Sequence, residues 1–396
     1  MFEALEPLSP DPILGLMAAF REDARAQKID LGVGVYRDEA GDTPIMKCVG
    51  EAEQRRFASE TTKSYIGPPG TPEFNDVARA LMFGAGHAVL RDKRVAGVQT
   101  PGGCGALRVG AELIKRARPA TTIWVSSPTW ANHVPLLGNA GLAIQEYAYY
   151  AKASHSLDAD GMLAALAEVP AGDVVLLHGC CHNPSGVDLK AEHWHAVARL
   201  ANERGFTPFI DLAYQGLGDG IEEDAAGVRI LGEACPELIV ASSYSKNFGL
   251  YRERVGALQI VSPSTQQTAI VQSQLGSVVR GIYSMPPAHG AAIVEIVMND
   301  EALRASWVDE LNGMRERING LRDLLAERLG AATGQDFGFI REQRGMFSFL
   351  GISPAQVQRL KDEFGIYMVD SSRINVAGVN GANVDYFVDA MRQVLV

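Results

Sequence analysis

The 396-residue sequence lacks any apolar run that approaches the roughly 18 residues of a membrane span. Its first ten residues, MFEALEPLSP, contain acidic residues and no basic cluster, so they do not resemble a targeting segment. The five cysteines are an odd number without paired spacing, which favours reduced thiols in a reducing compartment. These absences predict a cytoplasmic protein.

The chain also lacks blocks of lysine or arginine. Its 36 basic and 47 acidic residues give a formal net charge of −11, so its averaged field repels polyanions and no nucleic acid partner is expected. Hydrophobic residues make up 47% of the chain, which is typical of a globular protein with a large core. At this length we expect one domain of roughly 250 to 300 residues that carries a smaller one.

Nucleotide-binding signatures are absent as well. No G-x-G-x-x-G occurs, and the segment TPGGCG at residues 100–105 lacks the Lys-Ser/Thr ending of a P-loop. Its glycines can still turn backbone N–H groups toward an anion at the start of the helix that the following ALRVGAELIKRA predicts. Taken alone, the segment is also consistent with an ordinary turn, because glycine-rich turns are common.

The sequence does contain short apolar runs that alternate with amphipathic stretches. The runs TIWVSSP, VVLLHGC, TPFIDLA and ELIVASS predict parallel strands joined by helical crossovers. Asp11 and Pro12 have the pattern of a helix start. From Trp307 onward, apolar residues three and four apart predict a long helix that joins two domains. After it, FIREQRGMFSFLGI and IYMVDSSRINVAG predict strands of a smaller α+β domain, and VDYFVDAMRQVL predicts its closing helix.

Candidate chemistry lies where two of these runs end. ELIVASS leads into Lys246, and partial desolvation there would favour the neutral, nucleophilic amine that forms an imine with an aldehyde. Ser243 precedes this lysine by three residues and Arg254 follows it by eight, so the three together can seat a phosphate and an aldehyde on one ring. Considered by itself, a lysine in a loop is more often simply exposed.

Asp211 ends the run TPFIDLA, and Tyr214 follows three residues later. A buried carboxylate needs a cationic or hydrogen-bonding partner, and a protonated pyridine nitrogen would serve. Considered alone, Asp211 is equally well interpreted as a helix cap.

A cluster of His178, Cys180, Cys181 and His182 raises the alternative of zinc. On an extended segment His178, Cys180 and His182 would share a face, which suggests metal ligands. We expect no metal, because pairs at metal-ligand spacing are absent.

The shared order of these motifs resembles the aspartate/aromatic amino acid aminotransferase family, among the fold type I pyridoxal-phosphate (PLP) enzymes. The resemblance runs from DPILGL and LGVGVYRDE through TPGGCGALR, SPTWANH, HGCCHNPSG, DLAYQG and SSYSKNFGLYRERVG to PPAHGA, GMFSF and SRINVAG. It implies an α/β fold whose large domain, residues 44–313, has a mostly parallel seven-stranded sheet flanked by helices. Residues 1–43, with an N-terminal arm, and 314–396 would form the smaller α+β domain.

The resemblance also implies how PLP is held. Lys246 resembles the lysine that forms a Schiff base and carries the substrate proton, and Asp211 the residue that keeps the ring nitrogen protonated. Asn183 and Tyr214 would bond the phenolic oxygen, and Trp130 would stack on the ring. The further implied cofactor contacts are Gly102, Gly103, Cys104, Ser243, Arg254, His133 as the partner of Asp211, and Tyr65 from a second subunit.

For the substrate, Arg373 resembles the arginine that grips the α-carboxylate, a bidentate role that lysine performs poorly. Arg280, from the neighbouring subunit, resembles the residue that binds a distal carboxylate, and Gly34 lies in the segment that closes over the substrate. Trp130 and Asn183 are also implied substrate contacts. The implied enzyme is a homodimer with shared active sites.

The family turns through cis peptide bonds at the positions of Ser127-Pro128 and Asn183-Pro184, so we expect cis bonds here. Two departures from the family pattern bear on function. Cys104 replaces a threonine or serine of the glycine loop, which weakens one contact to phosphate. Met285 replaces the asparagine of a Ser-Asn-Pro-Pro segment, which favours aromatic substrates.

The implied activity is PLP-dependent exchange of the amino group between aspartate or aromatic amino acids (tyrosine, phenylalanine) and 2-oxoglutarate, by a ping-pong mechanism. Two alternatives remain open. The first is another fold type I PLP enzyme, a decarboxylase or lyase. The second is a non-enzymatic PLP-binding module, which the presence of both Arg280 and Arg373 disfavours. The sequence leaves the preferred donor and the physiological direction open.

Overall fold

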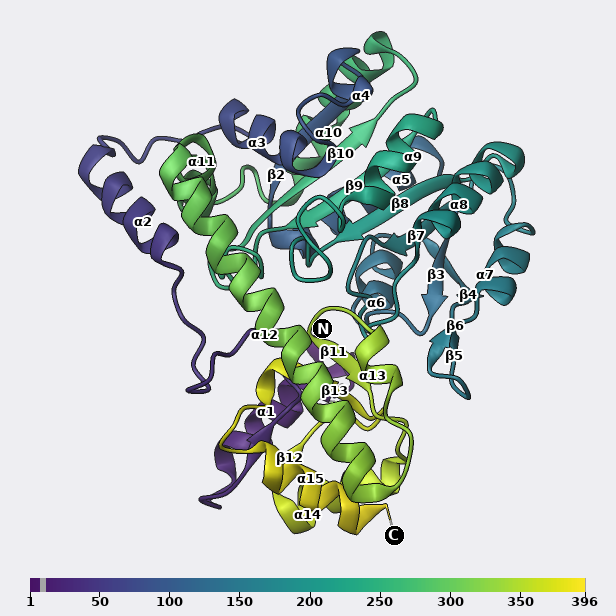
Figure 1. The fold of residues 1–396 in the computed structure, drawn as a ribbon. Coiled ribbons are helices and arrows are strands. Elements are labelled where there is room, and N and C mark those ends of the chain that lie inside the picture. Colours follow the sequence, from purple (N-terminus) through teal and green to yellow (C-terminus); the bar gives the residue numbers. More distant parts are fainter. Residues whose placement is uncertain (8–11, 396) are drawn as a thin grey trace. The chain divides into compact units, whose positions relative to one another are not determined.

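The computed structural model describes residues 1–7 and 12–395 and divides the chain into two compact units. The large unit comprises residues 44–317 and 343–345, and the small unit residues 1–43, 318–342 and 346–396. Figure 1 shows the elements of both units along the chain. The sequence placed a domain boundary after residue 313, and the units divide four residues later, inside a helix.

A seven-stranded sheet forms the centre of the large unit. Its order is β2 (Val95–Pro101), β10 (Val255–Val261), β9 (Leu238–Ser243), β8 (Thr207–Leu212), β7 (Val174–His178), β3 (Thr122–Ser127) and β4 (Ala143–Ala148). Strand β10 is antiparallel to both neighbours, and the other pairs are parallel. The four apolar runs are β3, β7, β8 and β9, so the predicted mostly parallel sheet is confirmed.

Helices cover both faces of this sheet, which is why β7, β8 and β9 are almost continuously apolar and buried. On one face, α5 (Gly102–Ala117) packs on β9, β10 and β2 beside α6 (His133–Gly138) and α10 (Thr265–Ile282). The other face carries α3 (Pro72–Phe83), α8 (Ala191–Arg204) and α9 (Ala226–Ala234) (Figure 1). The large unit also contains α2 (Lys47–Ser59), α4 (Ala88–Arg91), α7 (Ala159–Leu166), α11 (His289–Asn299) and a pairing of β5 (Tyr150–Ala151) with β6 (Ser156–Leu157).

Helix α12 (Glu301–Thr333) is the long helix that the apolar spacing predicts. All five residues of the predicted stripe are buried, which confirms the helix: Leu311, Met314, Ile318, Leu321 and Leu325. The large unit includes the helix up to residue 317, and the small unit includes the rest.

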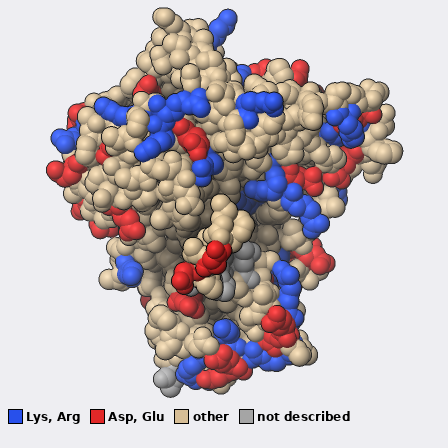
Figure 2. Space-filling model, turned by 180° about the vertical axis from the view of Figure 1, so that it is seen from behind, with Lys and Arg blue, Asp and Glu red and all other residues tan. Residues whose placement is uncertain are grey.

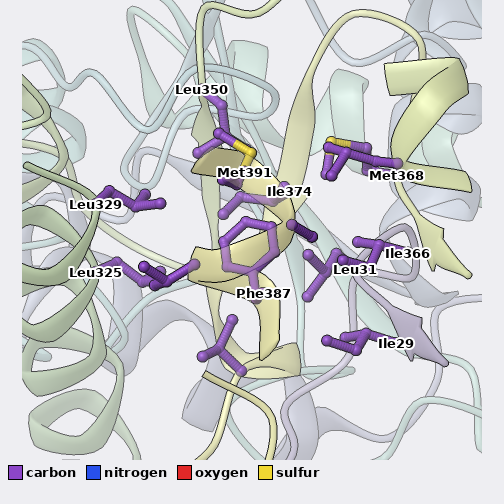
Figure 3. Close-up of a cluster of buried hydrophobic side chains, with 14 of the residues drawn as sticks. Ile29, Leu31, Leu325, Leu329, Leu350, Ile366, Met368, Ile374, Phe387 and Met391 are labelled. Atoms are coloured by element: carbon purple, nitrogen blue, oxygen red, sulfur yellow. The ribbon is translucent and has the colours of Figure 1, made fainter. Parts of the chain in front are cut away.

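The small unit has its own core (Figure 3). Phe387 and Met391 of α15 (Val384–Val394) pack with Leu325 of α12 and with Leu31 from the N-terminal segment. Its other elements are η1 (Phe2–Ala4), α1 (Pro12–Glu22), α13 (Phe339–Glu342), α14 (Pro354–Phe364), η2 (Val376–Gly378), the parallel pair β1 (Ile29–Asp30) and β12 (Ile366–Tyr367), and the antiparallel pair β11 (Phe347–Phe349) and β13 (Arg373–Asn375). The closing helix is confirmed as α15.

Two segments of the small unit differ from the prediction or lie partly outside the described residues. The expectation of a strand throughout FIREQRGMFSFLGI is wrong in its first part, because residues 339–342 form α13. The carboxylate of Asp336 accepts the N–H of Gly338 at 2.7 Å, and the turn it makes leads into this helix. The predicted cap Asp11 lies outside the described residues, and α1 begins at Pro12.

Among the helices of residues 1–7 and 12–395, none combines the length and the apolar character that crossing a bilayer requires. Figure 2 shows Lys and Arg side chains together with Asp and Glu side chains on one face of the molecule. Both signs of charge thus occur on that face.

Candidate active site

The central candidate residues meet where parallel strands end. His178, the last residue of β7, is paired in register with Asp211 near the end of β8. Ser243 is the last residue of β9, and Lys246 lies in the turn that follows. Because these strands run in the same direction, their carboxyl ends share one edge of the sheet, where such folds place their ligand sites.

Asp211 is buried and bonded to His133, the first residue of α6. The His133 Nε2 and Asp211 Oδ2 atoms are 3.0 Å apart, and the other ring nitrogen of His133 is 2.8 Å from the Thr129 hydroxyl. Burial alone would raise the pKa of Asp211, but the hydrogen bond to His133 and the electrostatic effect of neighbouring side chains, Lys246 among them, outweigh burial and leave the pKa lowered. Asp211 is therefore held as a carboxylate, as a partner for a cation.

Lys246 is half-buried, and its Nζ lies 4.6 Å from the centre of the Tyr214 ring. Desolvation lowers its pKa, and Asp211 and Cys104 oppose this effect. A lowered pKa makes more of the neutral amine available, which is the form that attacks an aldehyde or accepts a proton.

An anion cradle lies at the start of α5. Gly102 has a φ of +73°, and a Cβ there would lie 2.2 Å from Nη2 of Arg254. A Cβ on Gly103 would lie 3.2 Å from the Ser243 Cβ, so both glycines let the backbone approach these side chains. The structure begins α5 at Gly102, whereas the sequence predicted a turn over residues 100–105 before the helix. The amides of its first turn, the serine hydroxyl and the guanidinium therefore face the same place, which suits a phosphate.

Ser245 belongs to this cradle, although the sequence analysis did not single it out. Its Oγ is 3.0 Å from the Ser243 Oγ and accepts a hydrogen bond from Arg254 Nη1 at 3.3 Å. Arg254 also donates to the Tyr251 carbonyl at 2.8 Å, which fixes its guanidinium. Its position two residues after Ser243, just beyond the end of β9, was the available signal.

Cys104 lies in the first turn of α5 and is half-buried. Burial raises the pKa of its thiol, Arg254 and Lys246 lower it, and Asp211 raises it further. The net shift is upward, so the thiol stays protonated at neutral pH. A protonated thiol is a weaker hydrogen-bond donor than the hydroxyl of serine or threonine.

Two further site residues lie at the cis peptide bonds. Asn183 is the first residue of one of them, and Trp130 lies two residues after the proline of the other. Both expected cis bonds, Ser127-Pro128 and Asn183-Pro184, are confirmed. Asn183 is buried, and the Trp130 ring meets the His133 ring edge-on with centroids 5.2 Å apart. Trp130 is thereby placed beside the histidine that bonds Asp211.

Tyr65 and Arg280 are exposed, unlike Asp211, Ser243 and the other buried residues of the site. Tyr65 is 92% exposed. Arg280, in the last turn of α10, is also exposed and donates to the hydroxyl of Ser284. Both lie on the surface of the large unit.

Gly34 and Arg373 belong to the small unit and adjoin one aromatic ring there. The guanidinium carbon of Arg373 lies 4.4 Å from the centre of the Phe347 ring, and its Nη2 donates to the Gly32 carbonyl at 2.6 Å. A Cβ on Gly34 would lie 2.6 Å from Cζ of Phe347. Only glycine therefore fits beside this ring without displacing it.

His178 is a site residue that the sequence analysis considered only as a metal ligand. It is 8% exposed, its ring lies 5.1 Å from that of His133, and neither ring nitrogen has a hydrogen-bond partner among the described residues. Burial, together with the neighbouring His133, lowers its pKa to about 3 against the opposing effect of Asp211. A histidine near the end of the apolar run VVLLHGC, which precedes TPFIDLA in the sequence, was the available signal.

His178, Cys180 and His182, the zinc face considered as an alternative, do not form a group of possible ligands within the part of the chain that the structure describes. Side chains that could share an ion gather instead as His133, His178 and Asp211, and as Cys180, Cys181 and Asp224. His182 bonds the hydroxyls of Ser126 and Ser185, at 3.0 and 2.8 Å. The ring of His182 is thus engaged within the protein.

Comparison with known proteins identifies the family. The family model for aminotransferases of class I and II matches residues 26–391. The chain belongs to this family. A relative within it, the aspartate aminotransferase of Salmonella typhi, is 49% identical over 396 residues and all of both chains. The aromatic-amino-acid aminotransferase of Paracoccus denitrificans is 47% identical over 395 residues, again with full coverage of both chains.

Solved structures of this aminotransferase family confirm the fold. The aromatic-amino-acid aminotransferase of Burkholderia pseudomallei, solved with covalently bound PLP, matches all of both chains with a TM-score of 0.98 and 44% identity. The aromatic amino acid aminotransferase of Psychrobacter sp. B6, co-crystallised with aspartic acid, matches with a TM-score of 0.97 and 44% identity, again over both whole chains. The predicted family and the predicted α/β fold are therefore both confirmed.

Proposed function

We propose that this protein is a PLP-dependent aminotransferase that exchanges the amino group between aspartate or aromatic amino acids and 2-oxoglutarate by a ping-pong mechanism. The observation that carries the proposal is Lys246, an amine of lowered pKa, placed after the same sheet edge as the ionised Asp211 and beside an anion cradle. The substrate classes follow from relatives named for aspartate and for aromatic amino acids.

The donor set fits PLP. Arg254, Ser243, Ser245 and the amides of residues 102–104 would hold its phosphate, and Asp211 would pair with the protonated ring nitrogen. When bound, PLP supplies an electron sink for the charge left by cleavage of the substrate Cα–H bond. The protein's task is then to hold the ring, the substrate and one mobile proton.

Lys246 would move that proton, and four other side chains would hold the ring. Lys246 Nζ, neutral in part because it is desolvated, would take the proton from the substrate α-carbon and deliver it to C4′ of the coenzyme. His133 keeps Asp211 ionised, so that the carboxylate in turn keeps a cationic ring nitrogen protonated. Tyr214, against which the Lys246 amine lies, would bond the phenolic oxygen together with Asn183.

The substrate carboxylates would be bound by arginines. Arg373 of the small unit would bind the α-carboxylate, and Gly34 lies in the segment that would close over the substrate. Arg280 would bind the distal carboxylate of aspartate, and Trp130 and Asn183 would contact the substrate from the PLP side. An aromatic substrate requires Arg280 to swing away or to stack on its ring.

The active form we propose is a cytoplasmic homodimer with shared active sites. Tyr65, 92% exposed, would reach the phosphate of the neighbouring subunit, and Arg280 would reach its substrate. Phe57 on α2 is 89% exposed, and an exposed aromatic of this kind is typical of a surface that a partner covers. The large and small compact units would be the PLP-binding domain and the smaller domain of each subunit.

Replacement of the central amine tests the proposal. Lys246→Ala should remove the imine absorption band of the PLP-loaded protein and lower kcat for aspartate plus 2-oxoglutarate by at least about 10²-fold, because general base catalysis contributes that much. Lys152→Ala, which changes an exposed lysine, is the matched control and should keep both. Amino exchange at full speed without Lys246 would refute the proposal. Release of carbon dioxide or ammonia, with no glutamate formed, would replace it with a decarboxylase or lyase.

The role of Arg280 can be separated from that of Arg373. Arg280→Ala should lower kcat/KM for aspartate by about 10- to 150-fold, the equivalent of one charge-assisted hydrogen bond, and change it little for phenylalanine. Arg373→Ala should lower kcat/KM for both, because both substrates carry the α-carboxylate. Equal losses on the two substrates in Arg280→Ala would show that this residue does not bind the distal group.

A further inference from the structure

The large unit contains a cavity of about 560 Å³ at the edge of the sheet away from Lys246. Val174 and Thr207, the first residues of β7 and β8, line it, as does Ile239 at the second position of β9. Val261, the last residue of the antiparallel β10, lies at the same edge. Asp211 and Lys246 lie at the opposite ends of these strands, so this cavity is distinct from the candidate active site.

Most of the cavity wall is apolar. Ile114 of α5, Ile239 and Ile260 belong to the buried cluster between the sheet and α5, and the cavity continues that cluster to the surface. On α10, Val271 is half-buried and Ile270 is 48% exposed. A hydrocarbon group placed here would remove this apolar surface from water, at about 25 cal/mol per Å².

Two arginines stand at the rim, at the end of α5. Arg116 Nη1 donates to Gln274 Oε1 at 2.9 Å and to Ser277 Oγ at 3.1 Å, so its hydrogen-bond partners are neutral. Arg118 makes no side-chain hydrogen bond or ion pair with any residue in the described ranges. Its Nη1 lies against Gly172, 1.2 Å from where a Cβ on that glycine would be. The acidic residue of the lining is the exposed Glu237, so the rim carries one net positive charge.

A buried hydroxyl at the same cavity has no partner. Ser262 lines the cavity and is 1% exposed, and within residues 1–7 and 12–395 nothing hydrogen-bonds its Oγ. Its backbone is engaged with Arg94. A buried hydroxyl without a partner costs about 1–3 kcal/mol, and a carboxylate held in the cavity would offer it an acceptor.

We propose that this cavity binds a small apolar molecule with a single carboxylate. The hydrocarbon part lies against Ile114, Ile239 and Ile260, and the carboxylate is bound by Arg118, whose planar fork matches its two oxygens. The volume falls in the range of roughly 300–1,000 Å³ that ligand pockets occupy. One net positive charge at the rim favours one carboxylate over two. The proposal does not depend on the catalytic activity.

The test uses the PLP-loaded protein with octanoate as the probe and calorimetric titration as the measurement. We expect one octanoate per chain, bound more tightly than octan-1-ol, and still bound in the presence of saturating 2-oxoglutarate. Arg118→Ala should weaken octanoate binding by about 10-fold or more and leave amino exchange unchanged. Arg91→Ala is the matched control: this exposed arginine ends the short helix α4 and should keep the wild-type affinity.

A second variant addresses the apolar wall. Val271→Phe enlarges a half-buried side chain of the lining and should weaken octanoate and octan-1-ol binding together. The proposal is overturned if no saturable binding is observed, if 2-oxoglutarate displaces octanoate, or if Arg118→Ala binds it as tightly as the wild type.

Discussion

At the scale of single residues, the candidate site holds two neighbouring groups in opposite protonation states. His178 and Asp211 are paired on adjacent strands. Burial keeps His178 neutral, whereas the hydrogen bond between Asp211 and His133 keeps Asp211 ionised. The carboxylate therefore faces the ligand space with its charge intact. A neutral His178 adds no positive charge that would compete with a cationic ring nitrogen for Asp211.

His178 should make the protein sensitive to acid. Its pKa is about 3 in the folded chain and about 6.5 in the unfolded chain, so the unfolded state binds this proton first as the pH falls. The stability contributed by the neutral ring is complete above pH 6.5 and is lost toward pH 3, by up to about 1.4 kcal/mol per pH unit. In His178→Gln the free energy of unfolding, measured with urea at several pH values, should fall less steeply over this window. His195→Gln, which changes an exposed histidine of α8, should keep the wild-type slope, and an unchanged slope in His178→Gln would contradict the assignment.

Sequence reasoning reached Lys246, Asp211 and Arg254 because each stands at a recognisable distance from the end of an apolar run. It did not reach His178 or Ser245 as site residues. The role of His178 depends on the register between β7 and β8, and the contact of Ser245 depends on the approach of Arg254 from the start of β10. The local sequence marks both residues as candidates, but it does not specify either of these contacts.

At the scale of elements, the antiparallel strand β10 brings its first residues against the start of α5. A Cβ on Gly256 would lie 2.5 Å from the carbonyl carbon of Gly102 and 2.7 Å from the carbonyl oxygen of Ser242. Backbone stands on both sides, so no side chain can rotate away to make room. The spacing of the anion cradle thus depends on a residue without a side chain in β10.

Gly256→Ala should therefore push β10, β9 and α5 apart. We expect a loss of about 1–3 kcal/mol in the free energy of unfolding, as for other overpacked positions, together with weaker PLP binding in titrations of the PLP-free protein. Gly313→Ala in α12 is the control, because an added Cβ there meets nothing within 4 Å. That helical substitution should be neutral or stabilise by about 0.5–1 kcal/mol. Wild-type stability and PLP affinity in Gly256→Ala would show that Gly256 does not set the spacing of the anion cradle.

The element predictions succeeded where one face or both faces of an element are apolar. The runs of β3, β7, β8 and β9 and the stripe of α12 are signals of that kind. Strand β10 was not distinguished, because strand direction leaves no mark in its composition. The short α13 was taken for a strand, because four residues are too few to show a helical period.

At the scale of the whole molecule, the two compact units draw on the chain differently. The large unit is one stretch, residues 44–317, with three residues added, whereas the small unit combines both ends of the chain. The family resemblance implied this arrangement. Apolar patterns alone do not specify it, because β1 and β12 are only two residues long and are paired across more than three hundred residues. The core in Figure 3 holds the small unit together.

Phe387→Ala tests that core. The ring of Phe387 is fully buried, and its removal should lower the free energy of unfolding of the small unit by about 3–5 kcal/mol. Scanning calorimetry should show the earlier transition in the small unit, with the large unit less affected. Phe2→Ala, at a residue that is 75% exposed, should leave the profile unchanged. A uniform shift of the entire profile would show that the two units unfold as one cooperative block.

The pairing of β1 with β12 has a consequence for synthesis on the ribosome. Ile29 emerges early, but its partner Ile366 is translated only after the whole large unit has been made. Until then Ile29 and Leu31 of the nascent chain have no native surface to cover them, and at about 5–20 residues per second this interval lasts many seconds. A premature stop codon shortly before Ile366 would release a chain with a finished large unit and a permanently uncovered amino-terminal segment, a substrate for chaperones and proteases.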